Sequence, residues 1–285
     1  MSQITTLIKE LREKTGAGFL DCKKSLEENN NDMEKSIETL RKKGLAKASK
    51  KMDREANEGA VGIYSNDDHI VIIKVNSETD FAAKSDTFLN FLDSLGELAL
   101  KNNNINLDKQ VFLKLPYEGE TIESYFNNMI AKIGENLILN DLIVINNTDS
   151  NFSYYIHNSY KDNIGKIIST IKYSSKNYND KIEKLSKNLC MHVAAMKPES
   201  LDIDDLDNEI ISKEQNIQKE LILRSGKPEN IVEKILEGKM KKFYSEVTLL
   251  NQTYILDQEK TIKSLLSEYT KDYDYKILSF DIISL

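Results

Sequence analysis

Two stretches of this chain share one plan, in which two β-type runs around a polar turn are followed by an amphipathic helix. The first hairpin and helix cover 59–77 and 86–101, and the second cover 152–175 and 179–196. Alternation along a strand leaves one face of each hairpin apolar, and the following helix can cover that face. The repeat, at a distance of about a hundred residues, therefore indicates a duplicated α+β core.

Before the first hairpin, the sequence predicts a small module of three helices. Ile4 and Leu11 lie at helical spacing, and the glycines of KTGAGF (14–19) end that helix. A second helix follows. Asn31 is placed to cap a third helix, which we expect to end at Gly44. A module this short has little core of its own.

The stretches between and after the two hairpins also have recognisable patterns. Residues 101–116 are rich in Asn and Lys and predict a loop that holds at most a short strand. A helical pattern over 121–136 precedes a strand pattern over 137–146. The tail 245–285 mixes a helix with two strand-like runs, so we expect the chain to return to the core sheet.

A pair of helical patterns precedes that tail. They cover 209–224 and 231–244, and the segment between them contains Gly226 and Pro228. Pro is well tolerated in the first turn of a helix, so this spacing predicts an antiparallel helical hairpin. The predicted organisation is 1–54 (helical module and basic linker), 55–146 (first core half), 147–205 (second core half), 206–244 (hairpin) and 245–285 (return to the second core half).

Charge is distributed unevenly along the chain. Residues 1–54 carry 13 Lys and Arg against 9 Asp and Glu, whereas the remainder carries 26 against 37, for a net charge of −7. The basic run at 41–54 is typical of a solvated helix end and linker. It also suits a basic module that meets an acidic protein face. An adaptor that binds RNA or the ribosome through 41–54 remains an alternative, although an acidic body repels phosphates.

The residue types that carry enzyme chemistry are sparse and scattered. No phosphate-loop or dinucleotide motif occurs, and Cys22 and Cys190 lie far apart. His69, His157 and His192 have no metal-ligand spacing, and we expect each to be a surface or capped residue. An enzyme with an unrecognised site remains a further alternative. We expect a contact protein that is not an enzyme and has no cofactor or metal.

Composition also predicts where the protein works. Two cysteines fit a reducing compartment, and no apolar run is long enough to span a bilayer. We therefore expect a cytoplasmic protein with no membrane partner.

The stretch IVIIKVNSETDFAAKSDTF (70–88) holds the strongest candidate for a contact site. An apolar strand ends, and Asp80 and Phe81 follow at the turn into the next helix. Turns favour small and polar residues, so a large aromatic is unusual there. Phe81 either folds back into the core or is held out for a partner. Thr79 and Asp80 are both of the type that caps a helix.

Several stretches resemble the elongation factor Ts family, and they follow one another over nearly the whole chain. They are LREKTGAGFLDCKKSL (11–26), KVNSETDFAAKS (74–85), AKIGEN (131–136), MHVAAMKP (191–198) and SGKPENIVEKILEGKMKKFYSEVTLLNQ (225–252). The resemblance implies a ubiquitin-associated-like N-terminal module of three helices. It also implies a core of two similar α+β halves, with a coiled-coil hairpin inserted in the second.

The resemblance implies a function as well. Members of this family are guanine-nucleotide exchange factors for elongation factor Tu, the GTPase that delivers aminoacyl-tRNA to the ribosome. They bind its GDP form, disturb the Mg²⁺ and phosphate site, expel GDP and leave a nucleotide-free partner. No direct contact with nucleic acid is implied. A homodimer or a heterotetramer with elongation factor Tu remains open, because the hairpin can serve self-association or partner contact.

The family resemblance assigns roles to the residues of the turn. Phe81 is expected to act as a wedge between helices of the GTPase near its Mg²⁺ site, and Asp80 to disturb the shell around the metal. Thr79 is expected to hold both neighbours out. Ala82 stands where the family usually has Val, which removes contact area beside the wedge and is expected to lower affinity.

Two further sets of contact residues are expected from the resemblance. Phe19, Leu20 and Lys23 of the N-terminal module are expected to clasp the GTPase domain. For Leu20 the alternative is a place in the small core of the module. Met191 and His192 of the second core half are expected to approach a β-barrel domain of the partner.

Overall fold

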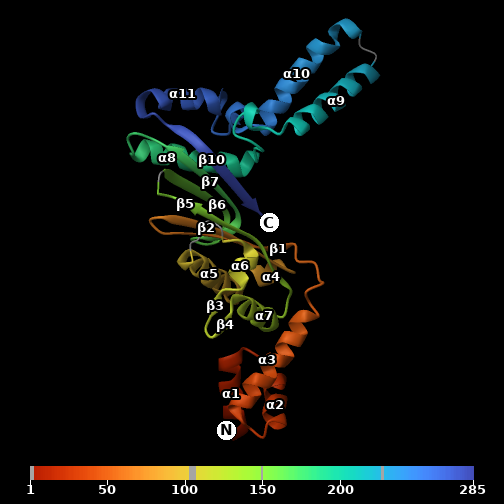
Figure 1. Ribbon diagram of the computed structural model, residues 1–285, viewed down its shortest axis with the longest axis vertical. Helices are drawn as coiled ribbons and strands as arrows, with labels where there is room; N and C mark the ends of the chain where they lie inside the picture. Colours follow the sequence, from red (N-terminus) through yellow and green to blue (C-terminus); the bar gives the residue numbers. More distant parts are fainter. Residues whose placement is uncertain (1–2, 103–106, 149, 226–227) are drawn as a thin grey trace. The chain divides into compact units, whose positions relative to one another are not determined.

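The computed structural model describes residues 3–102, 107–148, 150–225 and 228–285. The chain divides into two compact units, described here one at a time (Figure 1). The first contains the residues up to 148 together with 158–166 and 285, and the second contains 149–157 and 167–284. Both combine helices with antiparallel strands, which confirms the α+β class. The finer domain boundaries given above remain predictions.

Three helices open the first unit: α1 (Gln3–Thr15), α2 (Phe19–Glu28) and α3 (Met33–Ser49). Their small core contains Ile8, Leu11, Cys22, Leu26 and Leu40. Ser25 and Ser36, both completely buried, each donate a side-chain hydrogen bond to the other's carbonyl oxygen and so join α2 to α3. The predicted Asn31 cap is wrong, because the Asp32 carboxylate accepts from the amide of Lys35 instead.

Helix α3 is longer than the sequence predicts and does not end at Gly44. It packs against α7 (Ile122–Ile133), and a Cβ at Gly44 would lie 3.1 Å from the Cβ of Ala131. Gly44 therefore serves a close approach between two helices rather than a helix end. The Arg41 guanidinium forms an ion pair with Glu120 at the same junction.

The sheet of the first unit is built on the hairpin of β1 (Glu58–Ser65) and β2 (His69–Ser77), with β5 (Leu137–Asn146) antiparallel to β2. Val61 and Gly62 of β1 also pair with the first residues of β7. Helices α5 (Asp86–Lys101) and α7 contribute apolar side chains to the core beside this sheet. Strand β2 is buried at all but its first residue and Lys74, which explains its continuous apolar run.

Part of the segment predicted as a loop is helical. Helix α6 (Lys109–Leu113) is followed by the short strands β3 (Pro116–Tyr117) and β4 (Glu120–Thr121). The Asp108 carboxylate caps α6 by accepting from the amide of Val111 at 2.8 Å, and Phe112 is completely buried. Residues 103–106 of the predicted loop lie outside the described residues.

The second unit is built on β6 (Asn151–Lys161), β7 (Ile164–Ser174) and β10 (Lys276–Ser284), although the tip of the β6–β7 hairpin belongs to the first unit. Strand β10 pairs antiparallel with β7, as expected for a tail that returns to the core sheet. The other elements are α8 (Asp180–Met196), η1 (Ile203–Asp205), η2 (Leu249–Asn251), β8 (Thr253–Tyr254), β9 (Asp257–Thr261) and α11 (Ile262–Tyr273).

Helices α9 (Asn208–Arg224) and α10 (Glu229–Val247) lie side by side in the second unit (Figure 1). The Lys219 ammonium lies 3.5 Å from the Glu233 carboxylate across the pair. Gly226, which was expected to separate the helices, lies outside the described residues. None of the helices in the described ranges has the length and apolar character needed to cross a membrane.

Candidate partner-contact site

The turn after β2 is fixed by hydroxyl groups. Thr79 has extended backbone and caps the one-turn helix α4 (Asp80–Ala83), because its Oγ1 accepts from the amide of Ala82 at 3.2 Å. The Ser77 hydroxyl donates to the Thr79 carbonyl oxygen at 2.9 Å. Ser85 then caps α5, where its Oγ accepts from the amide of Phe88 at 3.2 Å. The sequence therefore builds a hydrogen-bonded corner between a buried strand and a largely buried helix.

Phe81 is held out of the core by this corner. Its side chain is 84% exposed, whereas its neighbours Ala82 and Ala83 are buried. The two alternatives left open by the sequence are thus decided in favour of an exposed ring. Ala82, which stands where the family usually has Val, is itself buried. The smaller side chain therefore affects the packing beneath the corner as well as the area available to a partner.

Asp80 is the first residue of α4 rather than its cap. Its carboxylate lies 2.7 Å from the Lys84 ammonium, one helical turn away. The hydrogen bond from Lys84 holds the pKa of Asp80 below its usual range. Because both side chains are about half exposed, this ion pair is weak and can be exchanged for another partner.

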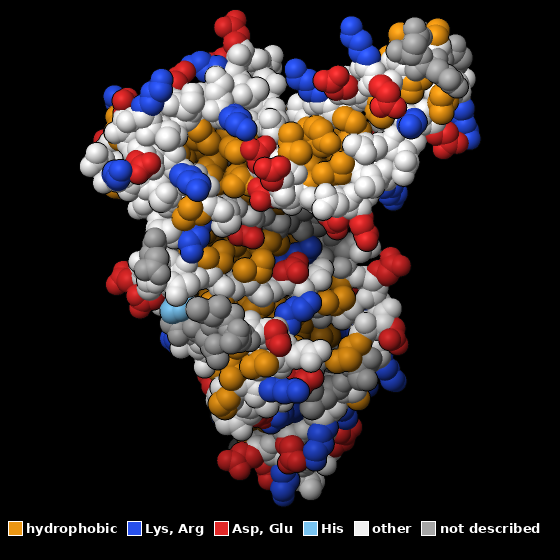
Figure 2. Space-filling view, turned by 45° about the horizontal axis from the view of Figure 1, so that its top comes forward, with side chains coloured by type: hydrophobic (Ala, Val, Ile, Leu, Met, Phe, Trp, Pro, Cys, Tyr) orange, Lys and Arg blue, Asp and Glu red, His pale blue; other side chains and the backbone are white. Residues whose placement is uncertain are grey.

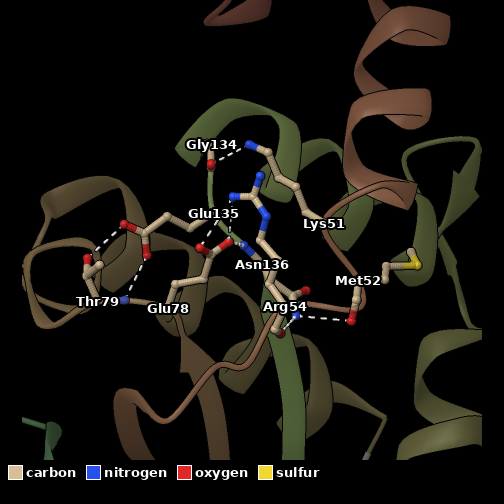
Figure 3. Close-up of polar contacts among 8 residues, drawn as sticks. All are labelled: Lys51, Met52, Arg54, Glu78, Thr79, Gly134, Glu135 and Asn136. Atoms are coloured by element: carbon tan, nitrogen blue, oxygen red, sulfur yellow. Dashed lines mark hydrogen bonds and ion pairs between the residues drawn. The ribbon is translucent and has the colours of Figure 1, made fainter.

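A loop distant in sequence contacts the corner directly. The two carboxylate oxygens of Glu135 accept from Thr79, one from its amide at 3.0 Å and one from its hydroxyl at 2.7 Å (Figure 3). Next to this contact, Glu78 accepts from the amide of Asn136 at 2.6 Å. Neither Glu135 nor Asn136 was predicted to act at this site. The AKIGEN stretch was the available signal, but a role for it requires the fold.

The three candidates in the N-terminal module are exposed. Phe19 and Leu20, in the first turn of α2, are 48% and 69% exposed, so the alternative of Leu20 as a core residue is wrong. Lys23 follows one turn later and lies 3.7 Å from the Glu27 carboxylate. These side chains form a small apolar and basic surface, and their role in partner contact stays a prediction.

The two candidates in the second core half lie differently. Met191 is half-buried, but His192 is completely buried, so its expected surface position is wrong. The Ile255 amide donates to His192 Nδ1 at 3.3 Å, which places the proton on Nε2, 2.9 Å from the Gln252 side-chain oxygen. A direct contact between this imidazole and a partner would require the core to open.

The burial of His192 predicts a pH-dependent stability. Burial lowers the pKa of His192, and the Gln252 hydrogen bond offsets this only in part. The imidazole therefore binds a proton more tightly in the unfolded chain than in the folded one. The contribution of neutral His192 to the free energy of unfolding is present above about pH 6.5, and it is lost as pH falls below that value. In urea unfolding, the free energy of unfolding is expected to fall more steeply between about pH 7.5 and 5.5 for the wild type than for His192→Gln. Equal slopes would contradict this role.

Apolar side chains also reach the surface of the α9–α10 pair (Figure 2). They are Ile210, Ile217, Leu221, Leu223 and Ile231. The structure does not bring three or more His, Cys, Asp or Glu side chains together as a metal site anywhere in the described part of the chain.

The sequence also matches known proteins of one family. The family model described as elongation factor TS matches residues 78–285. A relative named elongation factor Ts from Rhodospirillum centenum is 40% identical over 272 residues, which is 95% of this chain and 88% of that protein. Relatives of the same name from Rhizobium etli (strain CIAT 652) and Methylorubrum extorquens are 37% and 39% identical over 95% and 94% of the chain, covering 88% and 87% of their own lengths.

Proposed function

This chain belongs to the elongation factor Ts family, and we propose that it is the guanine-nucleotide exchange factor of an elongation factor Tu. Family membership supports a nucleotide-exchange role in translation elongation. The proposal adds the partner and the mechanism: the protein binds elongation factor Tu in its GDP-bound form, disturbs the Mg²⁺ and phosphate site and promotes GDP release.

The exposed ring of Phe81 is the observation that carries the proposal. Full burial of a Phe side chain contributes about 1.5–3 kcal/mol, and an 84% exposed ring gains little of this for folding. Three hydroxyls nevertheless hold the corner in place. An apolar group that is fixed but unburied is suited to bury its surface in a partner.

The mechanism follows from differential binding. GDP is held in such GTPases by backbone amides and by Mg²⁺, so a wedge that shifts the elements beside the phosphates weakens both. In the proposed complex Phe81 packs between helices of the GTPase, and Asp80 leaves Lys84 to engage groups near the metal. If the factor binds the nucleotide-free partner more tightly than the GDP form, linkage weakens GDP by the same factor.

The remaining parts of the proposal concern architecture and setting. We assign the three N-terminal helices as a ubiquitin-associated-like module and the α9–α10 pair as a coiled-coil hairpin. The factor acts in the cytoplasm and performs no bond chemistry. Its partner is elongation factor Tu in the GDP-bound and nucleotide-free states. The exposed apolar residues of the α9–α10 pair provide a surface either for self-association or for the partner.

The pairing of basic side chains in 41–54 with glutamates counts against the alternative of an adaptor that binds RNA or the ribosome. Arg41, Lys42, Lys43 and Arg54 each lie within ion-pair distance of a glutamate of the same unit. Even a weak, exposed pair places a negative charge beside the positive one, which lowers the local potential that attracts phosphates. This observation favours contact with a protein over contact with nucleic acid.

Release of a fluorescent GDP analogue from purified elongation factor Tu of the same organism tests the proposal. The factor is expected to accelerate release in proportion to its concentration until the partner is saturated. Acceleration that survives moderate salt favours the wedge over a charge-only contact, which should weaken steeply with salt, whereas the absence of any acceleration favours the adaptor. A folded factor that leaves the release rate of an active GTPase unchanged would overturn the proposal.

A second test concerns the N-terminal module. Leu20→Ala is expected to lower affinity for elongation factor Tu by about tenfold, because a largely exposed leucine can bury most of its surface only in a complex. The unfolding free energy should hardly change. Isothermal titration with nucleotide-free partner measures the affinity, and Met52→Ala, at another exposed apolar residue, serves as the control. Equal affinities for Leu20→Ala and wild type would remove Leu20 from the contact surface.

A further inference from the structure

We propose that Glu135 is a positioning residue that fixes the direction in which Phe81 is presented. The inference deepens the proposed exchange function and rests on it, since it concerns how the same corner is held. Glu135 lies 56 positions from Thr79 in sequence and comes from the loop between α7 and β5. Its contact with the corner is therefore a product of the fold.

The contact controls the cap of α4. Thr79 has one hydroxyl proton, and the Glu135 carboxylate accepts it at 2.7 Å. With the proton engaged there, a lone pair of the same oxygen is free to accept from the Ala82 amide, 3.2 Å away. The second carboxylate oxygen accepts from the Thr79 amide at 3.0 Å. Thr79, which directly precedes Asp80 and Phe81, is therefore held through both its backbone and its side chain.

The loop that carries Glu135 is itself held from two sides. Asn136 is almost completely buried, and its side-chain amide donates to the carbonyl oxygens of Met52 at 3.3 Å and Arg54 at 2.7 Å (Figure 3). Its backbone amide donates to Glu78, the residue before Thr79. The Lys51 ammonium also donates to the carbonyl oxygen of Gly134. A support held this firmly keeps the carboxylate of Glu135 aimed at the corner.

The arrangement separates two jobs at the corner. Phe81 and Asp80 are accessible to the partner, whereas both carboxylate oxygens of Glu135 are engaged in hydrogen bonds from Thr79. A freely moving α4 would have to be ordered when the complex forms, which lowers affinity. The carboxylate therefore acts through Thr79 by removing this ordering from the binding step.

The absence of tryptophan from the chain allows a direct test. Phe81→Trp places a single reporter at the corner, and its time-resolved fluorescence anisotropy measures local motion. The reporter is compared in three backgrounds, namely Glu135, Glu135→Gln and Glu135→Ala. Glu123→Ala, at an exposed glutamate on α7, is the matched control. Exchange activity is measured in parallel on the same variants with Phe81 intact.

Glu135→Ala is expected to reduce the rate of GDP release at low factor concentration by about tenfold, which is the loss typical of one hydrogen bond to a charged group. Local motion of the reporter and hydrogen exchange at the Thr79 and Ala82 amides should both increase. Glu135→Gln keeps one acceptor oxygen but loses the charge and the second acceptor, so we expect a smaller loss of activity and a smaller increase in both local motion and amide exchange than for Glu135→Ala. Glu123→Ala should match the wild type in all three measurements.

Unchanged reporter motion and unchanged amide exchange in a folded Glu135→Ala variant would overturn the inference. If that variant does not fold, a Glu135→Gln protein with both properties at wild-type values would overturn it equally. Failure of the proposed function is a separate result: the wild type would then not accelerate GDP release, while the reporter and the amides would still decide whether Glu135 fixes the corner.

Discussion

Replacement of Phe81 by alanine is expected to reduce the acceleration of GDP release by about ten- to a hundredfold, while the stability of the free protein hardly changes. A ring that is 84% exposed contributes little to folding. If it becomes buried in the partner, its loss removes about 1.5–3 kcal/mol of contact, which corresponds to this range. A separation of activity from stability is the signature of a contact residue.

The measurement is a titration of factor against a fixed amount of elongation factor Tu carrying a fluorescent GDP analogue. Urea unfolding of the same preparations reports stability. Tyr178→Ala is the matched control, because Tyr178 is an aromatic residue of the second unit with 62% exposure. Equal losses for Phe81→Ala and Tyr178→Ala would contradict a specific wedge, and so would full activity of Phe81→Ala.

A third variant separates wedge geometry from apolar area. Phe81→Leu keeps an apolar side chain of similar reach but loses the planar ring. If the ring must slide between two helices, this variant should lie nearer to Phe81→Ala than to the wild type. If contact area alone decides, it should retain most of the activity. Either result refines the contact that Phe81 makes, and the Phe81→Ala result decides whether the contact exists.

Local patterns predicted much of the architecture. The two hairpin-helix stretches indicated the α+β class, and the residue type of Thr79 indicated a cap that the structure contains. These features depend on spacing and on neighbours in sequence, which are visible in the chain itself. The side on which Phe81 emerges was left open, because a turn pattern does not specify which of its residues face the core.

Features that depend on distant partners were missed. The end of α3 was placed at Gly44 because glycine usually breaks helices, whereas here it allows α7 to approach. His192 was expected at the surface, but it is buried, and its Nε2 donates to the side-chain oxygen of Gln252, 60 residues later in the chain. Glu135 had no role until the fold brought it to Thr79. Each miss involves a contact across the fold that overrides a local preference.

Gly96→Ala is expected to destabilise the protein by about 3 kcal/mol, although the same change in most helices is stabilising. Gly96 lies within α5, and a Cβ there would come within 2.1 Å of the Tyr64 ring. That ring has little room to move. It is buried, and its hydroxyl donates to the Asp93 carboxylate at 3.0 Å.

The Asp93 carboxylate makes the ring harder to displace, because it also accepts from Lys161 at 2.9 Å and Asn163 at 3.1 Å. Moving Tyr64 would break a partly buried hydrogen bond to a charged group, which costs about 1.5–3 kcal/mol. Moving α5 instead would shift Ser85, which begins the helix at the Phe81 corner. The expected loss of stability is therefore accompanied by a loss of exchange activity in whatever remains folded.

Gly238→Ala provides the matched control for this prediction. Gly238 lies within α10, and a Cβ there would meet nothing within 4 Å. The substitution should stabilise the helix by about 0.5–1 kcal/mol, since alanine loses less backbone entropy than glycine. Urea unfolding of both variants compares an open position with a filled one. A Gly96→Ala protein as stable as Gly238→Ala would show that the Tyr64 ring yields, and that the spacing of α5 from the sheet is not set by this contact.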